Sequence, residues 1–155
     1  MISVVFVCTG NICRSPTAEA VLRAKVADAG LSNEILVSSA GLAGWHEGAD
    51  ADRRSLAALR ARGYELRHRA QHFQISWFDE HEIFVAMDSG HFAELRSLGP
   101  NAEVRLMREW DPRGNGSVPD PYYDDNGFEE VLDMIERSCD GLLEELRSRL
   151  GAASA

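Results

Sequence analysis

The chain has 155 residues, 45% hydrophobic and 26% charged, which is the size and composition of one ordinary globular domain with a single core. Its formal net charge of −9 argues against nucleic acid and against an anionic membrane as partners. The 3 cysteines are an odd number in a chain with no recognisable export signal, which argues against a disulfide scaffold and predicts reduced thiols in the cytoplasm.

The first predicted element is a buried β-strand over residues 4–8, a short and mostly β-branched run. No basic leader precedes this run, and it is too short to span a bilayer, so we expect neither a secretion signal nor a membrane segment. Ser15 and Pro16 are typical of the N-cap and the first position of a helix. The apolar residues that follow keep a helical spacing as far as Gly30.

The rest of the chain alternates strands with helices. Three further strands are predicted, at residues 35–39, 82–87 and 103–106, and helices at 50–62, 88–98 and from 128 onward. A long loop over 108–124 is rich in proline, glycine, aspartate and tyrosine, and loops of this length are usually functional or disordered. The alternation predicts the α/β class, with one domain over residues 1–155 built on a doubly wound four-stranded parallel sheet with helices on both faces.

The segment from Cys8 to Arg14 carries the strongest chemical signal. Cys8 ends the first strand, which is where ligands collect in a parallel sheet. The intervening residues are enough to wrap backbone N–H groups around the thiol, and the following helix adds the positive end of its dipole. This arrangement favours an ionised Cys8 thiolate, which the Ser15 hydroxyl can stabilise. Because Arg14 can grip two phosphoryl oxygens, the segment predicts a site that binds and attacks a phosphate dianion.

The cysteines also have less specific interpretations. A cysteine that ends an apolar strand is usually a small core residue, but here Gly10, Asn11 and a helix start follow it, which favours the functional interpretation. Cys13 is either loop filler or a partner that forms a reversible disulfide with Cys8 under oxidation. Cys139 lies on the apolar face of the last helix and is predicted to be structural.

A phosphate ester also needs an acid for its leaving group, and the long loop offers two candidates. Asp120 precedes a proline, and Tyr122 and Tyr123 follow as an aromatic wall suited to an aryl substrate. Asp111 also precedes a proline but has no aromatic residues after it. Asp-Pro is common in turns, so only its combination with the Cys8 loop favours Asp120 as acid and then base.

Residues 7–16 and 120–123 together resemble the low-molecular-weight protein tyrosine phosphatases, and the resemblance covers essentially the whole chain. It implies that Cys8 is the nucleophile, Arg14 the phosphate clamp and Asp120 the general acid and base. Ser15 would stabilise the thiolate. The amides of the loop would bind the phosphate, at Thr9, Gly10, Asn11, Ile12, Cys13 and Arg14.

The same resemblance implies supporting roles for residues that otherwise look ordinary. Asn11 matches a position held in a left-handed conformation, which asparagine tolerates better than most residues. Ser39 and His68 match positions that brace the loop by hydrogen bonds. Trp45, followed by His46, falls where the family lines the mouth of its pocket, although packing of Trp45 onto the protein body is an equal alternative.

The resemblance also defines the activity and its competitors. Ile12 is typical of tyrosine-directed members, whereas related arginine phosphatases carry threonine there. Related arsenate reductases need a further cysteine pair near residues 80–90, which this chain lacks. A binding module without turnover is a third alternative. We expect a bacterial, cytoplasmic, metal-independent enzyme without cofactors that acts on phosphotyrosine-containing proteins as a monomer or weak dimer, with a tyrosine kinase as a candidate partner.

Overall fold

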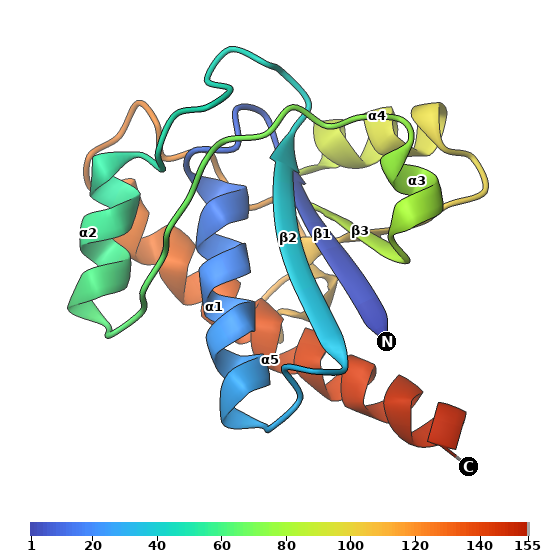
Figure 1. The fold of residues 1–155 in the computed structure, drawn as a ribbon. Coiled ribbons are helices and arrows are strands. Elements are labelled where there is room, and N and C mark those ends of the chain that lie inside the picture. The colour runs from blue at the N-terminus through green and yellow to red at the C-terminus, as the bar shows by residue number, and fades with distance from the viewer. Residues whose placement is uncertain (155) are drawn as a thin grey trace.

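The computed structural model describes residues 1–154 and is built on one parallel sheet (Figure 1). Its strands are β1 (Ile2–Cys8), β2 (Ile35–Gly41), β3 (Ile83–Ala86) and β4 (Glu103–Leu106), in the spatial order β2-β1-β3-β4. The helices are α1 (Arg14–Asp28), α2 (Arg53–Ala61), α3 (Trp77–Glu80), α4 (Ser89–Leu98) and α5 (Gly127–Ser154), with a 3₁₀ turn, η1, at Met107–Trp110. All three strand pairings are parallel, so the predicted fold class is confirmed.

The central strand β1 is buried on both faces of the sheet, as the unbroken apolar run over residues 4–8 predicts. Val4 and Phe6 pack into the core that α1 and α5 cover. Val5 and Val7 pack on the opposite face, in a core to which α4 contributes Leu95. Helices therefore cover both faces, and this two-sided core holds the end of β1 in place.

Several predicted boundaries are corrected by the structure. Helix α1 begins at Arg14 with Cys13 as its N-cap, so Ser15 is the second helical residue and not the cap. Its hydroxyl contacts Cys8 instead. Pro16 still lies in the first turn, where a helix needs no N–H donor. Two elements were missed altogether, the short helix α3 and the turn η1, which occupies the start of the predicted long loop.

The loops that follow β1 and β2, and the loop before α5, meet at the carboxyl edge of the sheet, at the top of Figure 1. Helix α2 lies beside this edge, next to the start of α5. Segments far apart in the sequence thus converge around Cys8. Within residues 1–154, no helix is both long and apolar enough to cross a membrane.

Candidate active site

Cys8 lies at the base of a pocket at this edge and is only 3% exposed. Its Sγ is 2.9 Å from the Oγ of Ser15 in the first turn of α1. The pocket is lined by residues from the loop after β1, the loop after β2 and the loop before α5: Cys8, Thr9, Gly10, Ile12, Cys13, Arg14, Trp45, His46, Asp120, Tyr122 and Tyr123. The pocket therefore brings together the two sequence motifs, residues 8–14 and 120–123, that are far apart in the chain.

Asn11 organises the loop from within. Its φ of +57° lies in the left-handed region, as the resemblance implies, and its side chain is fully buried. Asn11 Nδ2 donates to Ser15 Oγ at 2.8 Å and to Ser39 Oγ at 2.9 Å. Ser15 Oγ accepts this bond, so its own proton can point at the Cys8 sulfur at 2.9 Å or at the more distant Ala40 carbonyl oxygen at 3.5 Å.

Residues from outside the loop complete the bracing of Asn11. His68 Nε2 is 2.6 Å from the Asn11 carbonyl oxygen, and because a carbonyl only accepts, His68 donates. The backbone N–H of Gln71 donates to Asn11 Oδ1 at 2.9 Å. Ser39 in turn donates to the buried carboxylate of Glu19 at 2.7 Å. Ser39 and His68 make the contacts that the resemblance implies, whereas Glu19 and Gln71 were not anticipated.

Arg14 is buried at the mouth of the loop, with 3% of its surface exposed. One nitrogen, Nη1, donates to Asp88 Oδ2 at 2.8 Å and to the Val118 carbonyl at 3.0 Å. The other, Nη2, lies 3.6 Å from Asp120 Oδ2. Arg14 is thus held from behind by one nitrogen while the other faces the pocket.

Asp88 is the carboxylate that contacts Arg14, and the sequence indicated it only as a helix start. It caps α4 by accepting from the backbone N–H of His91 at 2.9 Å. Burial opposes ionisation of this carboxyl, but the hydrogen bonds from His91 and Arg14 outweigh it and keep the pKa of Asp88 below its ordinary value. Asp88 follows the end of β3, which places it at the same carboxyl edge of the sheet as Cys8. This position after a predicted strand could have identified Asp88 from the sequence.

His91 was also missed, and it connects Asp88 to the first residue of the loop. Its Nε2 is 2.8 Å from Thr9 Oγ1, and its buried Nδ1 lies 3.2 Å from Asp88 Oδ1 without hydrogen-bond geometry. Burial lowers the pKa of His91 to about 4, so the ring is neutral near pH 7. Asp88 therefore binds Arg14 at the end of the loop. It also lies beside His91, which contacts Thr9 at the start of the loop.

The structure separates the two aspartates that the sequence offered as acids. Asp120 lines the pocket, with 44% of its side chain exposed. Asp111 is fully buried between Arg108, at 3.0 Å, and Arg137, at 2.9 Å. Although burial works against the charge, these two arginines and the Arg113 N–H lower the pKa of Asp111 to about 2. A carboxyl held in this way is ionised and locked, so Asp111 is a structural residue.

Asp111→Asn should therefore lower stability without lowering the activity of the folded protein. Loss of one partner of a buried ion pair costs about 3 kcal/mol. Because the pKa of Asp111 falls from 3.8 to about 2 on folding, its contribution is full above about pH 5 and is lost as pH drops through 2. Urea unfolding at several pH values should show this acid-dependent loss in the parent and not in the variant. A folded variant with little activity would contradict the structural role.

The other two cysteines differ in position. Cys13 lines the pocket, and burial together with the nearby Asp52 carboxylate raises its pKa to about 12, which favours the neutral thiol. Cys139 is fully buried in α5 against α1, with its pKa raised by burial, as a core residue requires. All three thiols are free, and a reversible Cys8–Cys13 disulfide stays a prediction.

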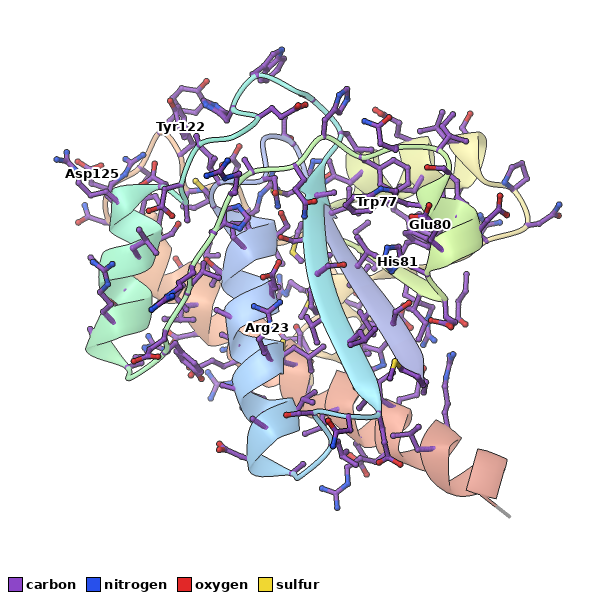
Figure 2. The ribbon with its side chains drawn as sticks, viewed as in Figure 1. Arg23, Trp77, Glu80, His81, Tyr122 and Asp125 are labelled. Atoms are coloured by element: carbon purple, nitrogen blue, oxygen red, sulfur yellow. The ribbon has the colours of Figure 1, made fainter. Side chains whose placement is uncertain are left out.

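Aromatic side chains form the mouth of the pocket. Trp45 is 78% exposed and Tyr123 is 90% exposed, so the alternative that Trp45 packs onto the protein body is wrong. Tyr122 meets Tyr123 edge-on, with ring centroids 4.9 Å apart, and the His46 ring lies 6.4 Å from that of Tyr122. Figure 2 shows Tyr122 and Asp125 above the start of α2. Within residues 1–154, no cluster of histidine, cysteine or acidic side chains is arranged to hold a metal ion.

The sequence and the fold of this chain are similar to those of known phosphatases. The family model described as "Low molecular weight phosphotyrosine protein phosphatase" matches residues 3–151. A low molecular weight protein-tyrosine-phosphatase of Streptomyces coelicolor is 51% identical, covering 98% of both chains. Phosphatase A of Mycobacterium tuberculosis is 44% identical over 95% of this chain and 93% of its own length. The crystal structure of a protein tyrosine phosphatase from Entamoeba histolytica, with Hepes in its active site, superposes with a TM-score of 0.92 at 33% identity, covering 96% and 98% of the chains.

Proposed function

The chain belongs to the low molecular weight phosphotyrosine protein phosphatase family of phosphoric monoester hydrolases, and we propose that Cys8, Arg14 and Asp120 carry out its reaction on phosphotyrosine and small aryl phosphates. One observation carries this proposal: the sulfur, the guanidinium and the carboxylate line the same pocket. Asp111, the other aspartate that the sequence suggested as the acid, is held by Arg108 and Arg137 and does not line this pocket.

The reaction divides into two displacements at phosphorus. In the first, the Cys8 thiolate attacks, the P–S bond forms and the P–O bond to the phenol breaks, while Asp120 donates its proton to the departing oxygen. In the second, Asp120 takes a proton from water, the water oxygen bonds to phosphorus, and the P–S bond breaks. The Ser15 hydroxyl at 2.9 Å stabilises the thiolate at the start and as it leaves.

The loop supplies the positive potential that an acidic chain otherwise lacks. Backbone N–H groups from Thr9 to Arg14 would point at the equatorial phosphoryl oxygens, and the α1 dipole adds to them. Arg14 Nη2 would bind the same oxygens. Asn11, with Ser39 and His68, holds these donors in place before substrate arrives, which is the condition for electrostatic stabilisation of the transition state.

The shape of the pocket supports an aryl substrate. Cys8 lies below a rim formed by Trp45, Tyr122 and Tyr123, so a phosphate must be presented on a flat side chain long enough to reach it. A phosphotyrosine ring can stack within this rim. Ile12 adds an apolar side chain to the lining, which supports a tyrosine over an arginine substrate because the guanidinium of phosphoarginine would find no hydroxyl there.

We further infer that residues 1–155 form a single bacterial phosphatase domain that works in the cytoplasm, without metal or cofactor, as a monomer or weak dimer. Its substrates would be phosphotyrosine proteins made by a tyrosine kinase. The experiment that tests the proposal is hydrolysis of one peptide carrying phosphotyrosine, phosphoserine or phosphoarginine, in EDTA. Release of phosphate from phosphotyrosine alone supports it, whereas tight binding without release would favour a binding module.

Asp120→Ala should slow the enzyme in a way that depends on the leaving group. General acid catalysis contributes about 10²–10⁴-fold, so kcat/KM for a phosphotyrosine peptide should fall by about 10²-fold or more. 4-Nitrophenyl phosphate, whose leaving group needs little protonation, should be affected much less. Asp124→Asn is the matched control, because Asp124 lies on the same loop and its side chain accepts from the Asn126 N–H, with no contact to Asp120 or Arg54 among the described residues. Equal slowing of both substrates by Asp120→Ala would mean that Asp120 is not the acid.

A further inference from the structure

Arg54, in the first turn of α2, makes an unusual set of contacts for a surface arginine. Its Nε donates to Asp52 Oδ1 at 3.0 Å, and its Nη2 donates to Asp52 Oδ2 at 2.9 Å. The same Nη2 donates to the Tyr122 carbonyl oxygen at 2.9 Å, and Nη1 pairs with Asp125 at 2.5 Å. One guanidinium therefore joins α2 to two points on the loop that carries Asp120.

Two aromatic rings hold the same guanidinium. Its central carbon lies 4.6 Å from the ring centroid of Phe128, which is buried in the first turn of α5, and 5.6 Å from that of Tyr122. Arginine over an aromatic face at this distance is an attractive cation–π contact. The contacts reach from Tyr122 to Phe128, so Arg54 holds the last part of the loop and the start of α5 together and is itself held in one orientation.

The other side of this clamp leads to the catalytic loop. Asp52 is the N-cap of α2, and its side chain accepts the backbone N–H of Arg54. The backbone N–H of Asp52 donates to the carbonyl oxygen of Ile12 at 2.7 Å. A short, continuous set of hydrogen bonds thus runs from the loop that carries the nucleophile, through Asp52 and Arg54, to the loop that carries the acid.

The backbone of Tyr122 is the last link. Its N–H donates to Asp120 Oδ1 at 3.0 Å, while its carbonyl accepts from Arg54. This leaves Asp120 Oδ2 to face the pocket, 3.6 Å from Arg14. A shift of the Tyr122 backbone would therefore turn the Asp120 carboxyl relative to the leaving-group oxygen, and proton transfer is sensitive to such shifts.

We propose that Arg54 is a positioning residue for the acid step, one that sets Asp120 over the Cys8 loop without touching substrate. This inference rests on the proposed role of Asp120. It predicts a selective defect: Arg54 should matter for leaving groups that need a proton and little for those that do not. A merely structural arginine would instead affect all substrates alike through the amount of folded enzyme.

Three variants test the proposal. Arg54→Ala should lower kcat/KM for a phosphotyrosine peptide by about tenfold and for 4-nitrophenyl phosphate by less than about twofold, part of the full acid contribution. Arg54→Lys should show a similar selective loss, because an ammonium lacks the planar fork that reaches Asp52, Tyr122 and Asp125 together. Arg53→Ala is the matched control, since Arg53 is the exposed neighbour in the same turn and makes no ion pair among the side chains described, those of residues 1–151.

Asp125→Asn keeps the test decisive if Arg54→Ala folds poorly. Asp125 is an exposed residue that provides one arm of the clamp, and its loss should give the same selectivity at about threefold. In an Asp120→Ala background, Arg54→Ala should have no further effect on the phosphotyrosine rate. Equal loss on both substrates, or a further loss in that background, would overturn the positioning role. If Asp120→Ala alone shows no dependence on the leaving group, the acid assignment itself has failed.

Discussion

Cys8→Ser is expected to remove essentially all turnover, with kcat lower by at least about 10⁴-fold, as when other enzymes lose their nucleophile. The serine hydroxyl stays protonated at neutral pH, and the 2.9 Å contact with Ser15 that stabilises a thiolate cannot make an alcohol nucleophilic. Buried main-chain donors and Arg14 remain in place, so the variant should still bind a phosphotyrosine peptide. Peptide binding and phosphate release measured on one preparation would separate these two effects.

The control for this prediction is a second buried thiol outside the pocket. Cys139→Ala removes a sulfur from the packing of α5 against α1, so it should lower stability by about 1–2 kcal/mol and leave kcat unchanged. Mass spectrometry of rapidly quenched parent enzyme should find a phosphoryl group on Cys8. Turnover by Cys8→Ser within a hundredfold of the parent, or a phosphoryl adduct on another side chain, would contradict the mechanism.

The sheet could be predicted because its signals are local. The residues of β1 that pack into the two cores, 4–8, are all apolar. The run is too short for a buried helix and therefore predicts a strand. Asp88 and Gly30 mark helix ends by side-chain capping and by a left-handed turn, respectively, and both are found where expected. The short elements α3 and η1 were missed because a single turn gives no periodicity to read.

The start of α1 was placed wrongly for an informative reason. Ser15 and Pro16 have the local preferences of a cap and a first helical residue, and those preferences predict a start two residues too late. In the fold, the Ser15 hydroxyl accepts from Asn11 and contacts Cys8, so it serves the loop that precedes α1 and does not cap the helix. A residue that departs from its local rule in this way is typical of a functional site.

The rest of the site depends on partners that no local pattern identifies. The two Asp-Pro dipeptides alone could not separate Asp120 from Asp111, and only the neighbouring residues favoured Asp120. The ion pairs that hold Asp111, with Arg108 in the 3₁₀ turn and Arg137 in α5, could not be predicted from the sequence. Gly41 is a similar case. A Cβ there would come within 2.8 Å of the Thr9 carbonyl, so the close approach of two loops requires glycine.

Arg14→Lys is the second prediction with a large expected effect, and it separates charge from geometry. In the parent, Nη1 is occupied by Asp88 and the Val118 carbonyl, while Nη2 faces the pocket. A lysine has one nitrogen for both tasks, and the carboxylate of Asp88 would retain it. We therefore expect kcat/KM to fall by about 10²–10³-fold, the loss typical of one transition-state donor.

The stability of the Arg14 variants should depend on whether a positive charge is kept beside Asp88. Arg14→Lys keeps a cation beside Asp88, so its urea midpoint should stay near that of the parent. Arg14→Ala leaves that partly buried carboxylate without its partner and should unfold more easily. Arg60→Lys, on the exposed face of α2, is the control for a change of arginine to lysine that does not affect rate. An Arg14→Lys enzyme within tenfold of the parent would mean that positive charge alone suffices, and that the two-sided grip of the guanidinium is not what binds the phosphoryl group.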